Sequence, residues 1–105
     1  MADAQTFLAA VDRLADRFRS MPQSRLLAPV PGYPSRAAAV LALAADSAGR
    51  ALELAGEPPR EFPDAGAFAV GDQLAVAGRE LAAVAGPEVL AQALDAVRSA
   101  DELTA

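Results

Sequence analysis

Apolar side chains recur every three or four residues along residues 3–20, which is the spacing of one face of an α-helix. Phe7, Val11, Leu14 and Phe18 mark this face, and most positions between them are arginine, aspartate or alanine. The pattern predicts an amphipathic helix. We expect the four marker side chains to be buried in the core of the protein.

Three further helices are predicted from the same periodicity and from the residues that begin and end helices. Residues 35–55 start at a serine that can cap a helix and stop before a glycine. Residues 64–85 start at a capping aspartate, and residues 87–102 start at a proline, which suits the first position of a helix. Gly71 and Gly78 lie inside the third helix, where glycine costs about 1 kcal/mol against alanine. We therefore expect another helix to approach closely at these two glycines.

Residues 21–34 contain four prolines and cannot form one continuous helix. The segment also carries several large apolar side chains, so two roles are open for it. It is either a lid over the end of the core or an exposed docking segment for a partner. A pocket beneath it, lined by Arg25, Tyr33 and Arg36, would suit an anionic or aromatic ligand.

The composition favours helices over strands. Alanine, the strongest helix former, is abundant, whereas isoleucine is absent and only two residues are threonine. We therefore expect an all-α protein with a single helical domain over residues 1–105. Its predicted architecture is a small up-down four-helix bundle with the proline-rich loop between the first two helices.

Several kinds of chemistry are excluded by residues that the chain lacks. It has no histidine, cysteine or lysine, and all nine of its basic residues are arginine. The imidazole, thiol and amine groups that commonly act as bases, nucleophiles or metal ligands are therefore absent. The acidic residues do not follow the spacing of a calcium-binding loop. We expect no catalytic residue, no metal site and no cofactor.

The formal net charge is −5 and the isoelectric point is about 4.5, which argues against binding to nucleic acid. The apolar runs are too short to span a bilayer, and the first residues lack the basic segment of a signal peptide. These observations predict a cytoplasmic protein that does not enter a membrane.

A second stripe on the third predicted helix lies roughly opposite its main apolar face and consists of Phe68, Asp72, Val76 and Arg79. Three interpretations are open. The helix is central in the core, or Phe68 lies beneath the preceding loop, or the stripe is an interaction surface with two apolar anchors and two rim charges. In a two-fold dimer, Asp72 could meet Arg79 of the other chain. We favour a non-enzymatic interaction module that binds itself or another helical protein. The alternative is a small ligand-binding or enzymatic domain that uses the pocket under residues 21–34.

Overall fold

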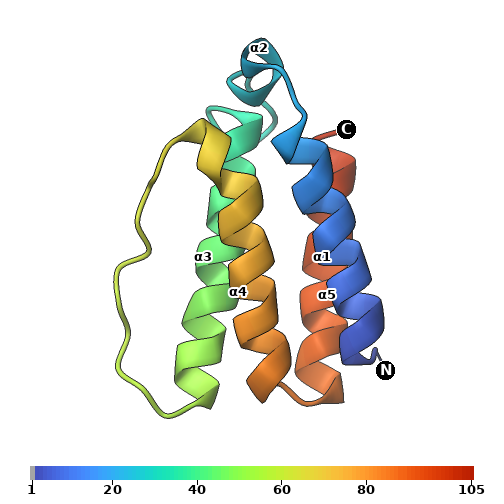
Figure 1. Ribbon diagram of the computed structural model, residues 1–105, viewed down its shortest axis with the longest axis vertical. Helices are drawn as coiled ribbons and strands as arrows, with labels where there is room; N and C mark the ends of the chain where they lie inside the picture. Colours follow the sequence, from blue (N-terminus) through green and yellow to red (C-terminus); the bar gives the residue numbers. More distant parts are fainter. Residues whose placement is uncertain (1) are drawn as a thin grey trace.

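The computed structural model describes residues 2–105, which fold into helices without any strand, so the predicted all-α class is confirmed. Four long helices lie side by side in two layers (Figure 1). Helices α1 (Ala4–Arg19) and α4 (Val70–Val84) form the layer nearer the viewer in this figure. Helices α3 (Arg36–Leu54) and α5 (Pro87–Leu103) form the layer behind them.

The direction of the helices differs from the predicted alternation. Helices α3 and α4 run in the same direction, because residues 55–66 return along the length of α3 before α4 begins (Figure 1). Three prolines keep this crossover extended, and the partly buried Phe62 packs against the core. The order of directions is therefore up, down, down, up. As a consequence α1 packs against α4 rather than mainly against α3.

The proline-rich loop is a lid over one end of the helices. It is not irregular throughout, because Gln23–Leu26 form the short helix α2. Leu26 is fully buried, and Met21 and Val30 are also counted in the core. A tight turn follows, in which Val30 and Tyr33 exchange backbone hydrogen bonds of 3.0 and 3.3 Å. Of the two roles considered for this segment, the buried side chains support the lid.

Two of the long helices start at a residue whose side chain caps the first turn, and the cap at Ser35 was predicted from the sequence. The Asp3 carboxylate accepts a hydrogen bond from the Thr6 backbone N–H at 2.7 Å, and the Ser35 hydroxyl accepts one from the Ala38 N–H at 2.9 Å. The bond from Thr6 lowers the pKa of the Asp3 carboxyl below its ordinary value. Each cap satisfies one of the backbone N–H groups that have no partner inside the helix.

The third long helix starts later than residue 64. Asp64 accepts a hydrogen bond from the Gly66 N–H at 3.0 Å and so closes a local turn instead of capping a helix. Gly66 adopts a φ of 95°, which an α-helix cannot contain. A 3-10 turn, η1 (Ala67–Ala69), then leads into α4 at Val70.

The core confirms the prediction for the first helix. Phe7 and Val11 have no exposed surface, and Leu14 and Phe18 are 1% and 3% exposed. They pack with aliphatic side chains from α3, α4 and α5 in one continuous cluster. No helix in the described part of the chain has the length and apolar character needed to span a membrane.

The close approach expected at the two glycines is also confirmed. A Cβ atom at Gly78 would lie 2.9 Å from Val11 Cγ1, and one at Gly71 would lie 2.8 Å from the Ala15 carbonyl oxygen. Both distances are shorter than any ordinary carbon contact. The α4 backbone therefore touches the α1 backbone at Gly71 and an α1 side chain at Gly78, and this brings the charged flanks of the two helices within reach of one another.

Candidate interaction surface

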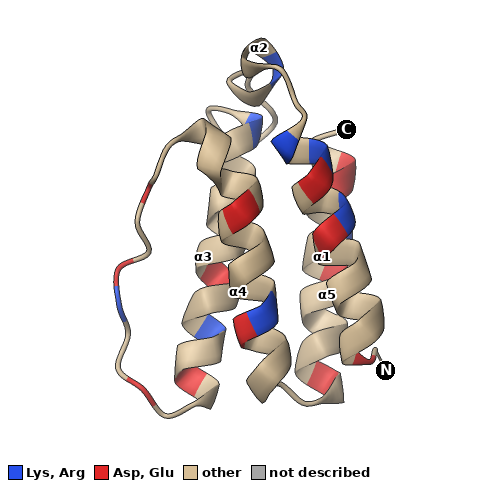
Figure 2. Ribbon diagram, viewed as in Figure 1, with Lys and Arg blue, Asp and Glu red and all other residues tan. Residues whose placement is uncertain are grey.

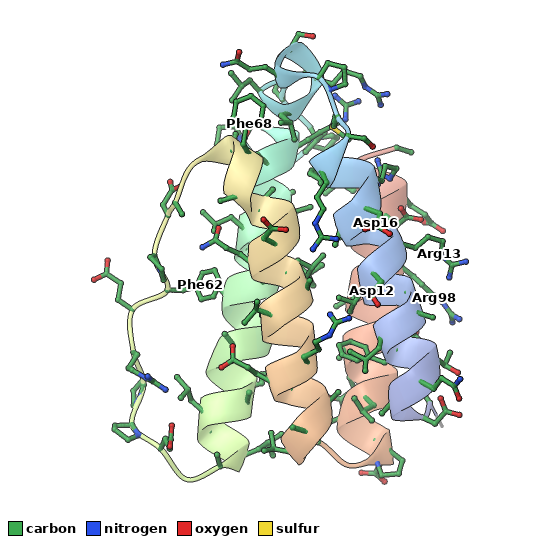
Figure 3. All side chains as sticks on the ribbon, in the orientation of Figure 1. Asp12, Arg13, Asp16, Phe62, Phe68 and Arg98 are labelled. Carbon is green, nitrogen blue, oxygen red and sulfur yellow. The ribbon has the colours of Figure 1, made fainter. Side chains whose placement is uncertain are left out.

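Phe68 and Val76 are the most exposed large apolar side chains of the described residues, at 67% and 60%. Phe68 lies in η1, just before α4 begins, and Val76 lies within α4 (Figure 3 labels Phe68). The interpretation that places these side chains in the core, or beneath the preceding loop, is therefore wrong. We call the stripe formed by Phe68, Asp72, Val76 and Arg79 the α4 surface.

The two charged residues of the α4 surface have partners on α1 in the same chain. Arg19 Nε donates to Asp72 Oδ1 at 2.7 Å. Arg79 donates from both of its terminal nitrogens to the two carboxylate oxygens of Asp12, at 3.0 and 3.1 Å. Asp72 and Arg79 thus each have an ion-pair partner within the single chain. Neither needs the predicted pair with the other residue across a dimer.

These ion pairs form a small network along the line where α1 and α4 meet (Figure 2). Arg19 also donates to Asp16 at 2.7 Å, so one guanidinium serves two carboxylates. The bonds to Asp72 and Asp16 raise the pKa of Arg19 above its ordinary value. The network encloses a shallow hollow of about 550 Å³, lined by Asp12, Asp16, Arg19, Asp72, Ala75, Val76 and Arg79.

The pocket predicted beneath the proline-rich loop is not formed by the three residues named for it. Arg36 donates to the backbone carbonyls of Thr104, Ala105 and Arg25, at 3.1, 3.2 and 3.4 Å. Its guanidinium is used to hold the end of α5 against the lid. The Arg25 side chain is exposed, and Tyr33 faces a different groove, so the three groups do not converge on one ligand.

Arg17 lies at the same end of the molecule, and the sequence did not predict a role for it. Arg17 donates to the Thr104 hydroxyl at 2.7 Å and to the Thr104 carbonyl at 2.9 Å. It also forms an ion pair of 2.9 Å with Asp101. Thr104 is fully buried. Together with Arg36, this arginine fixes the last turn of α5, which is a structural role.

The groove that Tyr33 faces lies between α3 and α5 and has a volume of about 420 Å³. Sequence periodicity did not indicate it, because four of the nine residues that line it are alanine and the two helices are far apart in the chain. A smaller hollow of about 180 Å³ lies beneath the crossover, where Phe62 points toward α3 (Figure 3).

No group of three or more acidic residues in residues 2–105 is placed to hold a metal ion. Comparison with protein families, with curated proteins and with solved structures finds no match to this chain.

Proposed function

We propose that this protein is a non-enzymatic helical interaction module, and that it associates with a second copy of itself through the α4 surface. The observation that carries the proposal is the exposure of Phe68 and Val76, at 67% and 60%. When a partner covers exposed apolar side chains, the complex is stabilised by about 25 cal/mol for each Å² of apolar surface removed from water. We place this association in the cytoplasm, as the sequence suggested.

An antiparallel arrangement of the two α4 helices brings the apolar anchors together. Phe68 and Val76 are eight residues apart, with Asp72 midway between them. A two-fold axis at Asp72 therefore places Phe68 of one copy against Val76 of the other, and the reverse contact follows by symmetry. Each anchor lies about 6 Å along the helix from the axis, at about 1.5 Å per residue.

The in-chain ion pairs favour such a contact. Because Asp72 already binds Arg19 and Arg79 already binds Asp12, neither charge enters the interface unpaired. An unpaired buried charge is strongly destabilising, whereas a charge that brings its own partner costs far less. The Asp72 carboxylate that lies between the anchors thus meets its symmetry copy at the axis together with the Arg19 guanidinium of its own chain.

The proposal predicts that Val76→Glu gives a monomer. The substitution places a carboxylate at the centre of the contact, next to Asp72 and opposite the phenyl ring of Phe68. Light scattering after size-exclusion chromatography should show a dimer for the wild-type protein and a monomer for the variant at the same high micromolar concentration. Circular dichroism should show the same helix content for both, because Val76 is 60% exposed in the single chain.

Val84→Glu is the matched control, since Val84 is also an exposed valine of α4, at 43%. It lies about 18 Å along the helix from the proposed axis, at about 1.5 Å per residue. This variant should remain dimeric. A monomeric wild-type protein would refute the proposed self-association, and loss of the dimer in both variants would refute its placement at Phe68 and Val76.

A further inference from the structure

The groove between α3 and α5 is an apolar channel on the side of the molecule opposite the α4 surface. Four alanines and a serine line it together with the larger apolar side chains of Tyr33, Leu43 and Leu103. The lining residues are Tyr33, Ala39, Ala42, Leu43, Asp46, Ala96, Ser99, Ala100 and Leu103. Several of these alanines keep part of their surface exposed, so the groove is open along its length.

The groove exists because α3 and α5 pack less closely than the other neighbouring pairs of long helices. On the opposite side, glycines in α4 let α1 approach until the two helices touch. Between α3 and α5 the contact is instead bridged by a polar bond, in which Arg50 donates to Gln92 at 2.8 Å. The space of about 420 Å³ beyond this bridge is left unfilled by alanine side chains.

The rim of the groove is acidic. Asp46 lines it directly and has no ion pair within the part of the chain that the structure describes. Asp95 and Glu102 immediately precede the lining residues Ala96 and Leu103, and helical periodicity places them on the solvent side of the same stretch of α5. Both are exposed. A partner at this groove therefore meets three carboxylates along the two helices and one guanidinium, that of Arg50, where Arg50 bridges α3 and α5, so the charge around the groove is net negative.

We propose that this groove binds an amphipathic helix of another protein, with large aliphatic side chains on one face and lysine or arginine on its flanks. Aliphatic side chains spaced at i, i+3 or i+4, and i+7 fill the holes between alanines of two neighbouring helices. Basic flanking residues pair with the carboxylates of Asp46, Asp95 and Glu102. Such a partner adds a third helix to the α3–α5 side of the molecule.

A second copy of this chain does not suit the groove. Its most exposed apolar helix face, the α4 surface, carries charges of both signs, from Asp72, Arg79 and Glu80, and lacks the uniformly basic flanks that an acidic rim favours. The whole chain carries a net charge of −5, so a second copy would bring further negative charge to an acidic rim. The groove and the α4 surface thus serve different partners, and the occupant of the groove is a basic helix from another protein.

The test uses two synthetic peptides of about 15 residues built from leucine, alanine and lysine, a length at which such helices are marginally stable alone. One has leucines on a single helical face with lysines on both flanks, and the other has the same residues in scrambled order. Fluorescence anisotropy should show the wild-type protein binding the patterned peptide at least about tenfold more tightly than the scrambled one.

Two variants locate the binding. Ala42→Gln fills the groove with a longer neutral side chain at an exposed position and should weaken binding of the patterned peptide about tenfold. Ala9→Gln makes the same change at an exposed alanine of α1 and should leave the affinity unchanged. Asp46→Asn should weaken binding about threefold, as expected for one exposed charge pair. All three variants should keep the wild-type helix content.

Equal affinity for both peptides would overturn the proposal, because binding would then follow charge alone. Unchanged affinity in Ala42→Gln, with wild-type circular dichroism, would also overturn it. If Ala42→Gln abolished self-association instead, the groove would bind a second copy and the proposed partner would be wrong. Loss of peptide binding in Val76→Glu would place the peptide on the α4 surface. The comparison of the two peptides, and that of Ala42→Gln with Ala9→Gln, does not depend on whether self-association through Phe68 and Val76 is correct.

Discussion

Gly78→Leu is expected to destabilise the protein by about 3 kcal/mol or more, because a buried leucine would have to push α1 away from α4. Even the first added carbon, Cβ, would lie 2.9 Å from Val11 Cγ1 and 3.1 Å from Val11 Cγ2. Val11 cannot move freely, since it has no exposed surface and is packed in the core. Thermal unfolding followed by circular dichroism should show a melting temperature far below that of the wild-type protein.

Two controls separate overpacking from the general effect of changing a glycine. Gly49 lies in α3 with no atom within 4 Å of an added Cβ, so Gly49→Ala should stabilise the protein by about 1 kcal/mol. Val11→Ala removes the methyl groups that meet Gly78, and Gly78→Ala should therefore cost less in the Val11→Ala background than in the wild type. A melting temperature of Gly78→Leu at or above the wild-type value would contradict the close contact of α1 and α4.

Phe18→Ala is expected to lower the free energy of unfolding by about 3–5 kcal/mol, the usual cost of removing a buried aromatic ring. The Phe18 side chain is 3% exposed and packs in the central cluster below the lid. Urea unfolding followed by circular dichroism measures this change. The free energy of unfolding of a domain is about 5–15 kcal/mol, so this one change removes a large share of it and should lower the melting temperature markedly.

Phe68→Ala makes the same substitution at a phenylalanine that is 67% exposed. Measured at low protein concentration, where the chain is monomeric, it should change the free energy of unfolding by less than about 1 kcal/mol. Equal and large losses in Phe18→Ala and Phe68→Ala would mean that Phe68 is buried in the single chain. The α4 surface would then have no apolar anchor at that end.

The sequence predicted best the helices in which an apolar face and a charged face are clearly separated. In α1 the apolar face is unambiguous because charged residues occupy the opposite side, and Phe7, Val11, Leu14 and Phe18 are all buried as expected. The two glycines of α4 were also interpretable, because glycine inside a helix is costly unless another helix comes close. Such patterns predict which side chains are buried, because they depend only on the spacing of residues within one helix.

The direction of α4 could not be predicted from local patterns. Residues 55–66 can span about 40 Å when extended, at about 3.3 Å per residue, whereas the 19 residues of α3 cover about 28 Å. The linker is therefore long enough either to turn back at once or to run the whole length of α3. The choice depends on the docking of Phe62 and on the contact between α1 and α4, and neither is visible in the linker sequence.

The candidate surface was predictable only in part. The spacing of Phe68 and Val76 on one stripe indicated an apolar surface, and both side chains are exposed. The partners of Asp72 and Arg79 could not be foreseen, because Arg19 and Asp12 lie 53 and 67 residues earlier and meet them only through the α1–α4 contact. The predicted pocket failed for the same reason, since Arg36 binds carbonyls 68 and 69 residues away.

Disulfide crosslinking of an Asp72→Cys variant tests the proposed self-association most directly. The chain contains no cysteine, so the introduced thiol is the only one that can react. With two α4 helices antiparallel about an axis at residue 72, the two thiols face each other across helices about 8–10 Å apart, and mild oxidation should convert most of the protein to a covalent dimer. Val84→Cys, whose thiols would lie about 36 Å apart along the helices, should stay monomeric under the same conditions. Absence of the covalent dimer in Asp72→Cys, or equal crosslinking of both variants, would contradict association through the α4 surface.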